Sequence, residues 1–124
     1  MQDIDQLCDA IRTNGFSLLK FLKHGHSERV YENGLKHRLE LQGIRIDQQH
    51  PISVRDEDGF VLGDFYADLV VERKILIELK AVRAINDDHV AQLLGYLRAT
   101  DLEFGLLINF GAPKFSIKRY ILST

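Results

Sequence analysis

Apolar residues recur at helical spacing through the first third of the chain. Residues 3–23 are predicted to be helical, with Thr13-Asn14-Gly15 as a break, so that two short helices or one kinked helix are expected. A second helix is expected to start after Ser27, a preferred N-cap residue, and to stop at Gly43. The apolar positions that define the two segments include Ile4, Leu7, Ile11, Tyr31, Leu35 and Leu39.

Beyond Gly43 the pattern changes to the two-residue period of β-strands. Residues 44–54 and 60–71 are expected to be extended and to be joined by a turn at 56–59. A reversal about Arg73 then leads into a short strand at 75–80. One face of the strand 64–71 is apolar and comprises Phe65, Ala67, Leu69 and Val71.

A third helix and two further strands complete the predicted order. Asn86 or Asp87 is expected to cap a helix that runs to about Ala99, with Ala91, Leu94 and Leu97 as a core stripe. Residues 104–110 and 115–121 are expected to be strands. This order predicts an α+β or α/β fold, with a central mixed sheet flanked by helices. One domain is expected over residues 1–124, with an extra N-terminal helical segment at about residues 1–16.

The composition narrows the class of protein. The chain has 124 residues, of which 45% are hydrophobic, so one domain can bury a core without disulfides. A formal net charge of −2 argues against a surface wholly devoted to nucleic acid, so any such contact must be local. The single cysteine excludes a cysteine-rich metal site. With no signal peptide and no apolar run near the roughly 20 residues that span a bilayer, a soluble cytoplasmic protein is expected.

The two strands around Arg73 carry charges at unusual positions. In a hairpin centred on Arg73, Asp68 lies opposite Glu78 on the same face, and Tyr66 pairs with Lys80. Directly opposed carboxylates destabilise a sheet, so the arrangement makes sense if a cation neutralises both. Because Lys80 shares their face, the three residues suit a magnesium-dependent phosphodiester hydrolase.

Three blocks of the sequence resemble a known family. The segment Gly25-His26-Ser27-Glu28-Arg29-Val30-Tyr31 resembles the motif of the GxxExxY proteins. Asp68 with Glu78-Leu79-Lys80 resembles the signature of the PD-(D/E)XK nuclease superfamily, with Ala67 in the place of the proline. Gln92-Leu93-Leu94-Gly95-Tyr96 and Leu106-Leu107-Ile108-Asn109-Phe110-Gly111 resemble the remainder of the same pattern.

This resemblance implies a restriction-endonuclease-like core and a role for each matching residue. Asp68 and Glu78 would bind the metal with the backbone carbonyl of Leu79, and Glu28 would join them directly or through water. Lys80 would orient or help to deprotonate the attacking water. Gln92 and Tyr96 would line the site, where Gln92 would belong to the catalytic residues and Tyr96 would bind the substrate. The basic residues proposed to contact phosphates are Arg83, Lys114 and Lys118.

The function expected from the resemblance is hydrolysis of phosphodiester bonds in DNA with Mg²⁺, for which Mn²⁺ would substitute. The small size favours a homodimer or a partner protein, by analogy with Holliday-junction resolvases of the superfamily. One alternative is an inactive module of the same fold that binds nucleic acid or protein. Another is an interaction protein that docks through the helix at residues 3–13.

Overall fold

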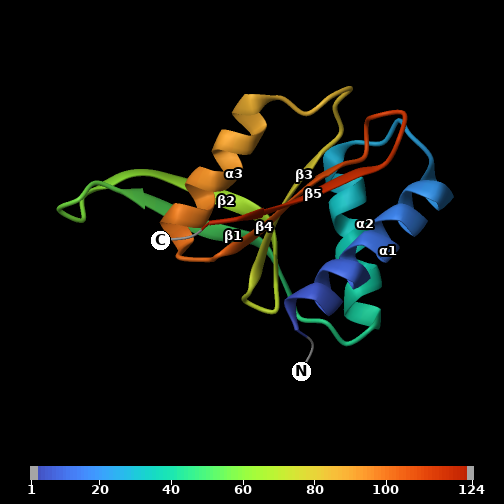
Figure 1. Ribbon diagram of the computed structural model, residues 1–124, viewed down its shortest axis with the longest axis horizontal. Coiled ribbons are helices and arrows are strands. Elements are labelled where there is room, and N and C mark those ends of the chain that lie inside the picture. The colour runs from blue at the N-terminus through green and yellow to red at the C-terminus, as the bar shows by residue number, and fades with distance from the viewer. Residues whose placement is uncertain (1–2, 123–124) are drawn as a thin grey trace.

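The computed structural model describes residues 3–122, which form a five-stranded sheet with helices on both faces (Figure 1). Helices α1 and α2 cover one face and α3 covers the other. This is the mixed sheet flanked by helices that the order of elements predicts. The elements are α1 Ile4–Leu22, α2 Glu28–Leu41, β1 Ile46–Arg55, β2 Val61–Val71, β3 Ile75–Lys80, α3 Asp87–Thr100, β4 Phe104–Asn109 and β5 Ser116–Ile121.

The strands lie in the order β1-β2-β3-β4-β5, and only β3 and β4 are parallel. A parallel pair needs a crossover, which α3 provides. The carboxyl ends of β3 and β4 therefore lie at the same edge of the sheet, where Lys80 pairs with Asn109. Residues that follow either strand are brought to this edge.

Helix α1 is continuous, so the predicted break at Thr13-Asn14-Gly15 is wrong. Asn14 Nδ2 donates to the carbonyl oxygen of Ala10 at 2.7 Å, which satisfies the side chain within the helix. A Cβ on Gly15 would lie 2.9 Å from the Phe115 ring. The glycine therefore allows close packing of α1 against the chain around β5 and does not end the helix.

Each face of the sheet has its own apolar core. The core under α1 and α2 includes Leu7, Ile11, Leu35, Leu39, Leu69, Ile77 and Ile108. The core under α3 includes Ile52, Ala67, Val70, Leu76, Leu93, Leu97 and Leu107. The predicted apolar face of β2 is thus wrong at Ala67, which packs on the face opposite to Leu69 and Val71.

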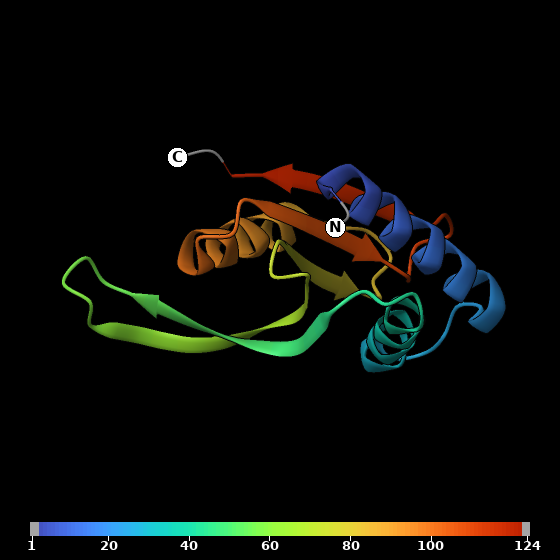
Figure 2. The same cartoon turned by 90° about the horizontal axis from the view of Figure 1, so that it is seen from below.

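A change of facing in β1 and β2 explains the position of Ala67. The pairing passes from Gln48–Leu69 to His50–Ala67 and omits Gln49 and Asp68. Gln49 has a φ of 51°, a left-handed conformation that interrupts the alternation of a strand. Beyond this point, residues 50–67 form a hairpin arm that projects from the body of the molecule (Figure 2).

Helix α3 begins where the sequence predicts. Asn86 accepts a hydrogen bond from the backbone N–H of His89, and His89 Nδ1 accepts one from the backbone N–H of Asn86. Of the predicted core stripe of α3, Leu97 is fully buried, whereas Ala91 is exposed. The other fully buried residue of the helix is Leu93, which was not predicted to belong to the stripe. None of the described helices is both long and apolar enough to cross a lipid bilayer.

A close backbone contact at Gly111 generates a stability prediction. A Cβ on Gly111 would lie 2.4 Å from the Ala81 carbonyl carbon and the Val82 nitrogen, so Gly111→Ala must displace the backbone that follows Lys80. We expect this change to lower the free energy of unfolding by about 1–3 kcal/mol in urea titrations.

Gly95→Ala is the matched control. Within α3 its Cβ would meet only Arg98 Nη2, at 4.0 Å, and alanine favours helix by about 1 kcal/mol over glycine. This variant should therefore gain stability. Equal effects of the two substitutions would contradict the close approach at Gly111.

Candidate active site

The turn between β2 and β3 sets the register of the two acidic residues. Residues 72–74 connect the paired Val71 and Ile75. Glu72 and Arg73 have φ values of 52° and 55°, and the backbone N–H of Lys74 donates to the Val71 carbonyl oxygen at 2.9 Å, which closes the turn. The ladder then pairs Leu69 with Ile77, which places Asp68 opposite Glu78. The predicted register is confirmed. Because the described ladder ends at the Leu69–Ile77 pair, the predicted pairing of Tyr66 with Lys80 is wrong.

Asp68 and Glu78 each bind the backbone of the opposite strand. The backbone N–H of Asp68 donates to Glu78 Oε2 at 3.2 Å, and the backbone N–H of Leu79 donates to Asp68 Oδ2 at 2.8 Å. These side-chain bonds take over where the regular ladder stops. The two carboxylates are therefore held together at the point where the strands separate.

Burial makes Glu78 a weaker acid than an exposed glutamate. Its residue surface is 5% exposed, and burial is the largest cause that raises its pKa from 4.5 to about 9. The hydrogen bond and charge of Asp68 act in the same direction, whereas the Lys80 charge lowers the pKa. Near neutral pH Glu78 therefore holds a proton, and bringing a cation to the pair would favour its release.

The donor set suits a hard divalent cation. Carboxylate oxygens are the ligands that Mg²⁺ prefers, and Asp68 and Glu78 supply them from one face of the sheet. Across residues 3–122 no group of three or more His, Cys, Asp or Glu side chains is arranged to hold a metal ion. The remaining ligands must come from backbone oxygens, such as the Leu79 carbonyl, or from water and substrate.

Helix α3 brings polar side chains to the carboxylates. Lys80 Nζ donates to Gln92 Oε1 at 3.2 Å, so the amine is held toward α3. Burial is the largest cause that raises the pKa of Tyr96, followed by the charges of Glu78 and Asp68, while a hydrogen bond from Gln92 lowers it. The hydroxyl of Tyr96 thus stays protonated beside the acidic pair and can serve as a donor.

The start of α2 reaches the same edge of the sheet. Glu28 Oε2 accepts a hydrogen bond from the backbone N–H of Ala81 at 3.1 Å, directly after Lys80. Tyr31 stacks on Phe110 with ring centroids 4.6 Å apart, and its hydroxyl donates to the Lys23 carbonyl oxygen at 2.6 Å. Within the segment from Gly25 to Tyr31, Glu28 therefore binds the backbone that follows β3, and Tyr31 fixes the start of the α1–α2 loop and the residue that follows β4.

Two buried polar residues support the site, and the sequence interpretation gave them no role. Asn109 Oδ1 accepts hydrogen bonds from the backbone N–H groups of Val82 and Gly111, at 3.1 and 2.9 Å. Glu32 accepts hydrogen bonds from Gln48 and Gln49, at 2.6 and 3.0 Å. The available signal for Asn109 was a polar residue at the end of an apolar strand.

The three basic residues proposed for phosphates lie around the site without a shared contact. Arg83 and Lys114 are exposed in the loops that follow β3 and β4. Lys118 pairs with Leu107, which pairs with Glu78, so Lys118 is two strands from Glu78, or about 10 Å by strand spacing. Its Nζ lies 5.5 Å from the centroid of the Tyr120 ring.

A family model described as the PD-(D/E)XK nuclease superfamily matches residues 5–120. The chain belongs to this superfamily. Its mixed sheet flanked by helices is the restriction-endonuclease-like fold expected from the resemblance.

Similarity to solved structures supports the same fold. The crystal structure of SSO0001 superposes with a TM-score of 0.58 at 20% identity, covering 75% of this chain and 48% of that chain. The present chain thus spans about half the length of that protein. No curated protein matches the sequence.

The raised pKa of Glu78 generates a prediction about stability without metal. The folded protein binds this proton more tightly than the unfolded chain, so the stabilisation is complete below about pH 4.5 and is lost as the pH rises through about 9. Glu78→Gln should remove that dependence. In urea titrations with chelator, the free energy of unfolding should fall less between about pH 5 and about pH 8 for the variant than for the wild type.

Glu57→Gln is the control, because Glu57 is an exposed carboxylate in the β1–β2 turn. It should behave like the wild type at both pH values. If Glu78→Gln retained the full pH dependence, the buried proton would be excluded.

Proposed function

We propose that this protein is a metal-dependent nuclease that hydrolyses phosphodiester bonds in DNA, and that it is a member of the GxxExxY proteins within the superfamily. The observation that carries the proposal is the pairing of half-buried Asp68 with buried Glu78, with Lys80 at the end of the strand that carries Glu78. The spacing of Gly25, Glu28 and Tyr31 supports the subfamily assignment, because Glu28 contacts the chain beside Lys80.

The side chains divide the work of binding and proton transfer. Asp68, Glu78 and the Leu79 carbonyl would hold the cation, with Glu28 joining through water. When bound, Mg²⁺ or Mn²⁺ supplies positive charge that polarises the scissile phosphate and lowers the pKa of water. Lys80, held by Gln92, would orient the attacking water and offset negative charge in the transition state.

The surroundings of the pair give the remaining residues their roles. Tyr96 would donate a hydrogen bond to a phosphate oxygen, and Arg83, Lys114 and Lys118 would neutralise flanking phosphates. An overall charge of −2 keeps this attraction local. A cytoplasmic homodimer is part of the proposal, because one small domain offers limited surface for a nucleic acid.

Two substitutions should separate metal binding from turnover. Wild-type protein should melt at a higher temperature with Mg²⁺ or Mn²⁺, because an ion that binds only the folded state stabilises it. At an ion concentration of one hundred times the dissociation constant, the free energy of unfolding rises by about 2.7 kcal/mol. Asp68→Ala should abolish this shift. Lys80→Ala should keep it and lower cleavage of single-stranded, duplex and branched DNA by about a hundred-fold or more.

Glu57→Ala and Lys74→Ala are the controls. Glu57 lies in the β1–β2 turn, and Lys74 lies at the opposite end of β3 from Lys80. Both variants should melt and cleave as the wild type does. A melting temperature unmoved by either ion, together with no cleavage of any DNA, would favour the inactive binding module. Cleavage that survives both Asp68→Ala and Lys80→Ala would exclude the assignment.

A further inference from the structure

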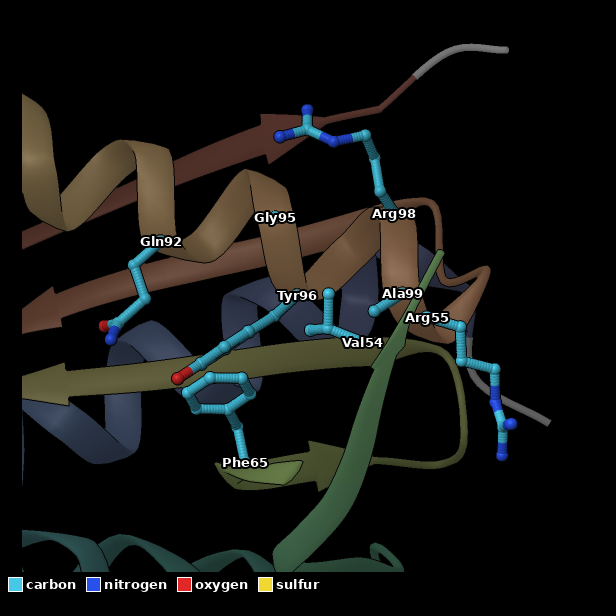
Figure 3. A pocket seen from close by; sticks show the side chains of 8 residues that line it. All are labelled: Val54, Arg55, Phe65, Gln92, Gly95, Tyr96, Arg98 and Ala99. Atoms are coloured by element: carbon cyan, nitrogen blue, oxygen red, sulfur yellow. The ribbon is translucent and has the colours of Figure 1, made fainter. Parts of the chain in front are cut away.

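A cavity of about 560 Å³ opens between the hairpin arm and α3. Figure 3 shows Phe65 on β2 and Tyr96 on α3 facing each other, while the side chains of Arg55 and Arg98 extend away from the two rings at the edge of the cavity. This volume falls within the range of about 300–1,000 Å³ that is typical of small-molecule sites. The lining residues are Val54, Arg55, Phe65, Gln92, Gly95, Tyr96, Arg98 and Ala99.

The cavity adjoins the candidate active site through Gln92. This side chain lines the cavity, and its Oε1 accepts the hydrogen bond from Lys80 Nζ at 3.2 Å. Tyr96 also belongs to both regions, because the charges of Glu78 and Asp68 act on its hydroxyl. A group that occupied the cavity would therefore be next to a phosphate positioned at Lys80.

The walls of the cavity suit a planar, apolar group. The rings of Phe65 and Tyr96 have centroids 5.9 Å apart and are tilted by 38°. Phe65 is 43% exposed, so part of its ring surface is free to contact a ligand. Val54 and Ala99 add apolar surface. Aromatic side chains of this kind stack on nucleobases, because every base has a π face.

The charge of the cavity suits a nucleic-acid backbone. Arg55 and Arg98 are the only residues in the lining that carry a formal charge, and both are positive. Neither forms a salt bridge with any residue in the range 3–122. Arg55 Nη1 donates to the Gly59 carbonyl oxygen at 3.0 Å, a neutral partner. Two arginines without a salt bridge in the described part of the chain, beside an exposed phenylalanine and a half-buried tyrosine, favour an anionic ligand with a flat face.

We propose that this cavity binds one unpaired nucleotide next to the scissile phosphate, with its base against Phe65 and Tyr96 and a neighbouring phosphate on Arg98. A base in a duplex is already stacked and paired, so its entry would cost the free energy of unpairing and unstacking, and a strand that is single at this position is favoured. The inference rests on the proposed function and adds to it a substrate class, single-stranded DNA or a single-stranded branch.

The test uses short DNA strands that carry one 2-aminopurine, whose fluorescence is quenched by stacking. Binding is measured in chelator, so that no strand is cut, with the same sequence presented as a single strand and as a blunt duplex. The single strand should bind the wild type with quenching of the probe. Phe65→Leu should weaken this binding by about ten-fold and reduce the quenching.

Each substitution has a matched control on the same chain. Phe21→Leu alters a 75% exposed phenylalanine on α1, away from the cavity, and should leave binding unchanged. Arg98→Gln should lower the slope of log affinity against log salt by about 0.7, the value for one phosphate contact on a single strand. Arg73→Gln, in the β2–β3 turn, should not change the slope. Because Arg98 is exposed on α3, its variant tests the proposal even if Phe65→Leu lowers stability.

The outcomes separate this inference from the nuclease assignment. Absence of single-strand binding, equal effects of Phe65→Leu and Phe21→Leu, or equal quenching in the duplex would overturn the cavity assignment, whatever the cleavage assay shows. Cavity-dependent binding without cleavage in Mg²⁺ or Mn²⁺ would leave the cavity assignment standing and remove the proposed nuclease activity.

Discussion

Repulsion between two carboxylates on one face of a sheet is the constraint around which this protein is organised. Asp68 and Glu78 are kept together by the turn at residues 72–74, which sets their register, and by backbone N–H groups that bind each carboxylate. Burial then makes the charged form of Glu78 costly and raises its pKa, so that Glu78 holds a proton near neutral pH. An acidic pair with one buried member contributes little to stability, and its presence favours a function that uses a cation.

The elements around the pair act as supports that meet at one edge. The parallel pairing of β3 and β4 brings Lys80 and Asn109 together, and Asn109 binds the loop that follows Lys80. Gly111 allows that loop to pass close by. Helix α3, which the crossover requires, supplies Gln92 to the Lys80 amine. The same topology that forms the sheet therefore positions both Lys80 and its partner Gln92.

The acidic register could be predicted because it depends only on local rules, namely the period of a strand and the length of a turn. Features that depend on tertiary contacts could not. Gly15 gives a breaking signal in the sequence, yet it faces Phe115 and the helix continues. The left-handed Gln49 is not a glycine, so nothing in the alternation indicated that β1 and β2 change faces there. The cavity was missed for the same reason, because the positions of Phe65 and Arg98 relative to each other follow from that change.

Helix α2 holds two separate parts of the structure through glutamates one helical turn apart. Glu28 binds the backbone after β3, while Glu32 binds Gln48 and Gln49 on β1, at the point where the β1–β2 pairing is interrupted. Since both carboxylates project from one rigid rod, a displacement of α2 would loosen both anchors at once. Integrity of this edge of the sheet is thereby linked to packing of the N-terminal helices, so that partial loss of that layer should disorder the candidate site before the sheet itself unfolds.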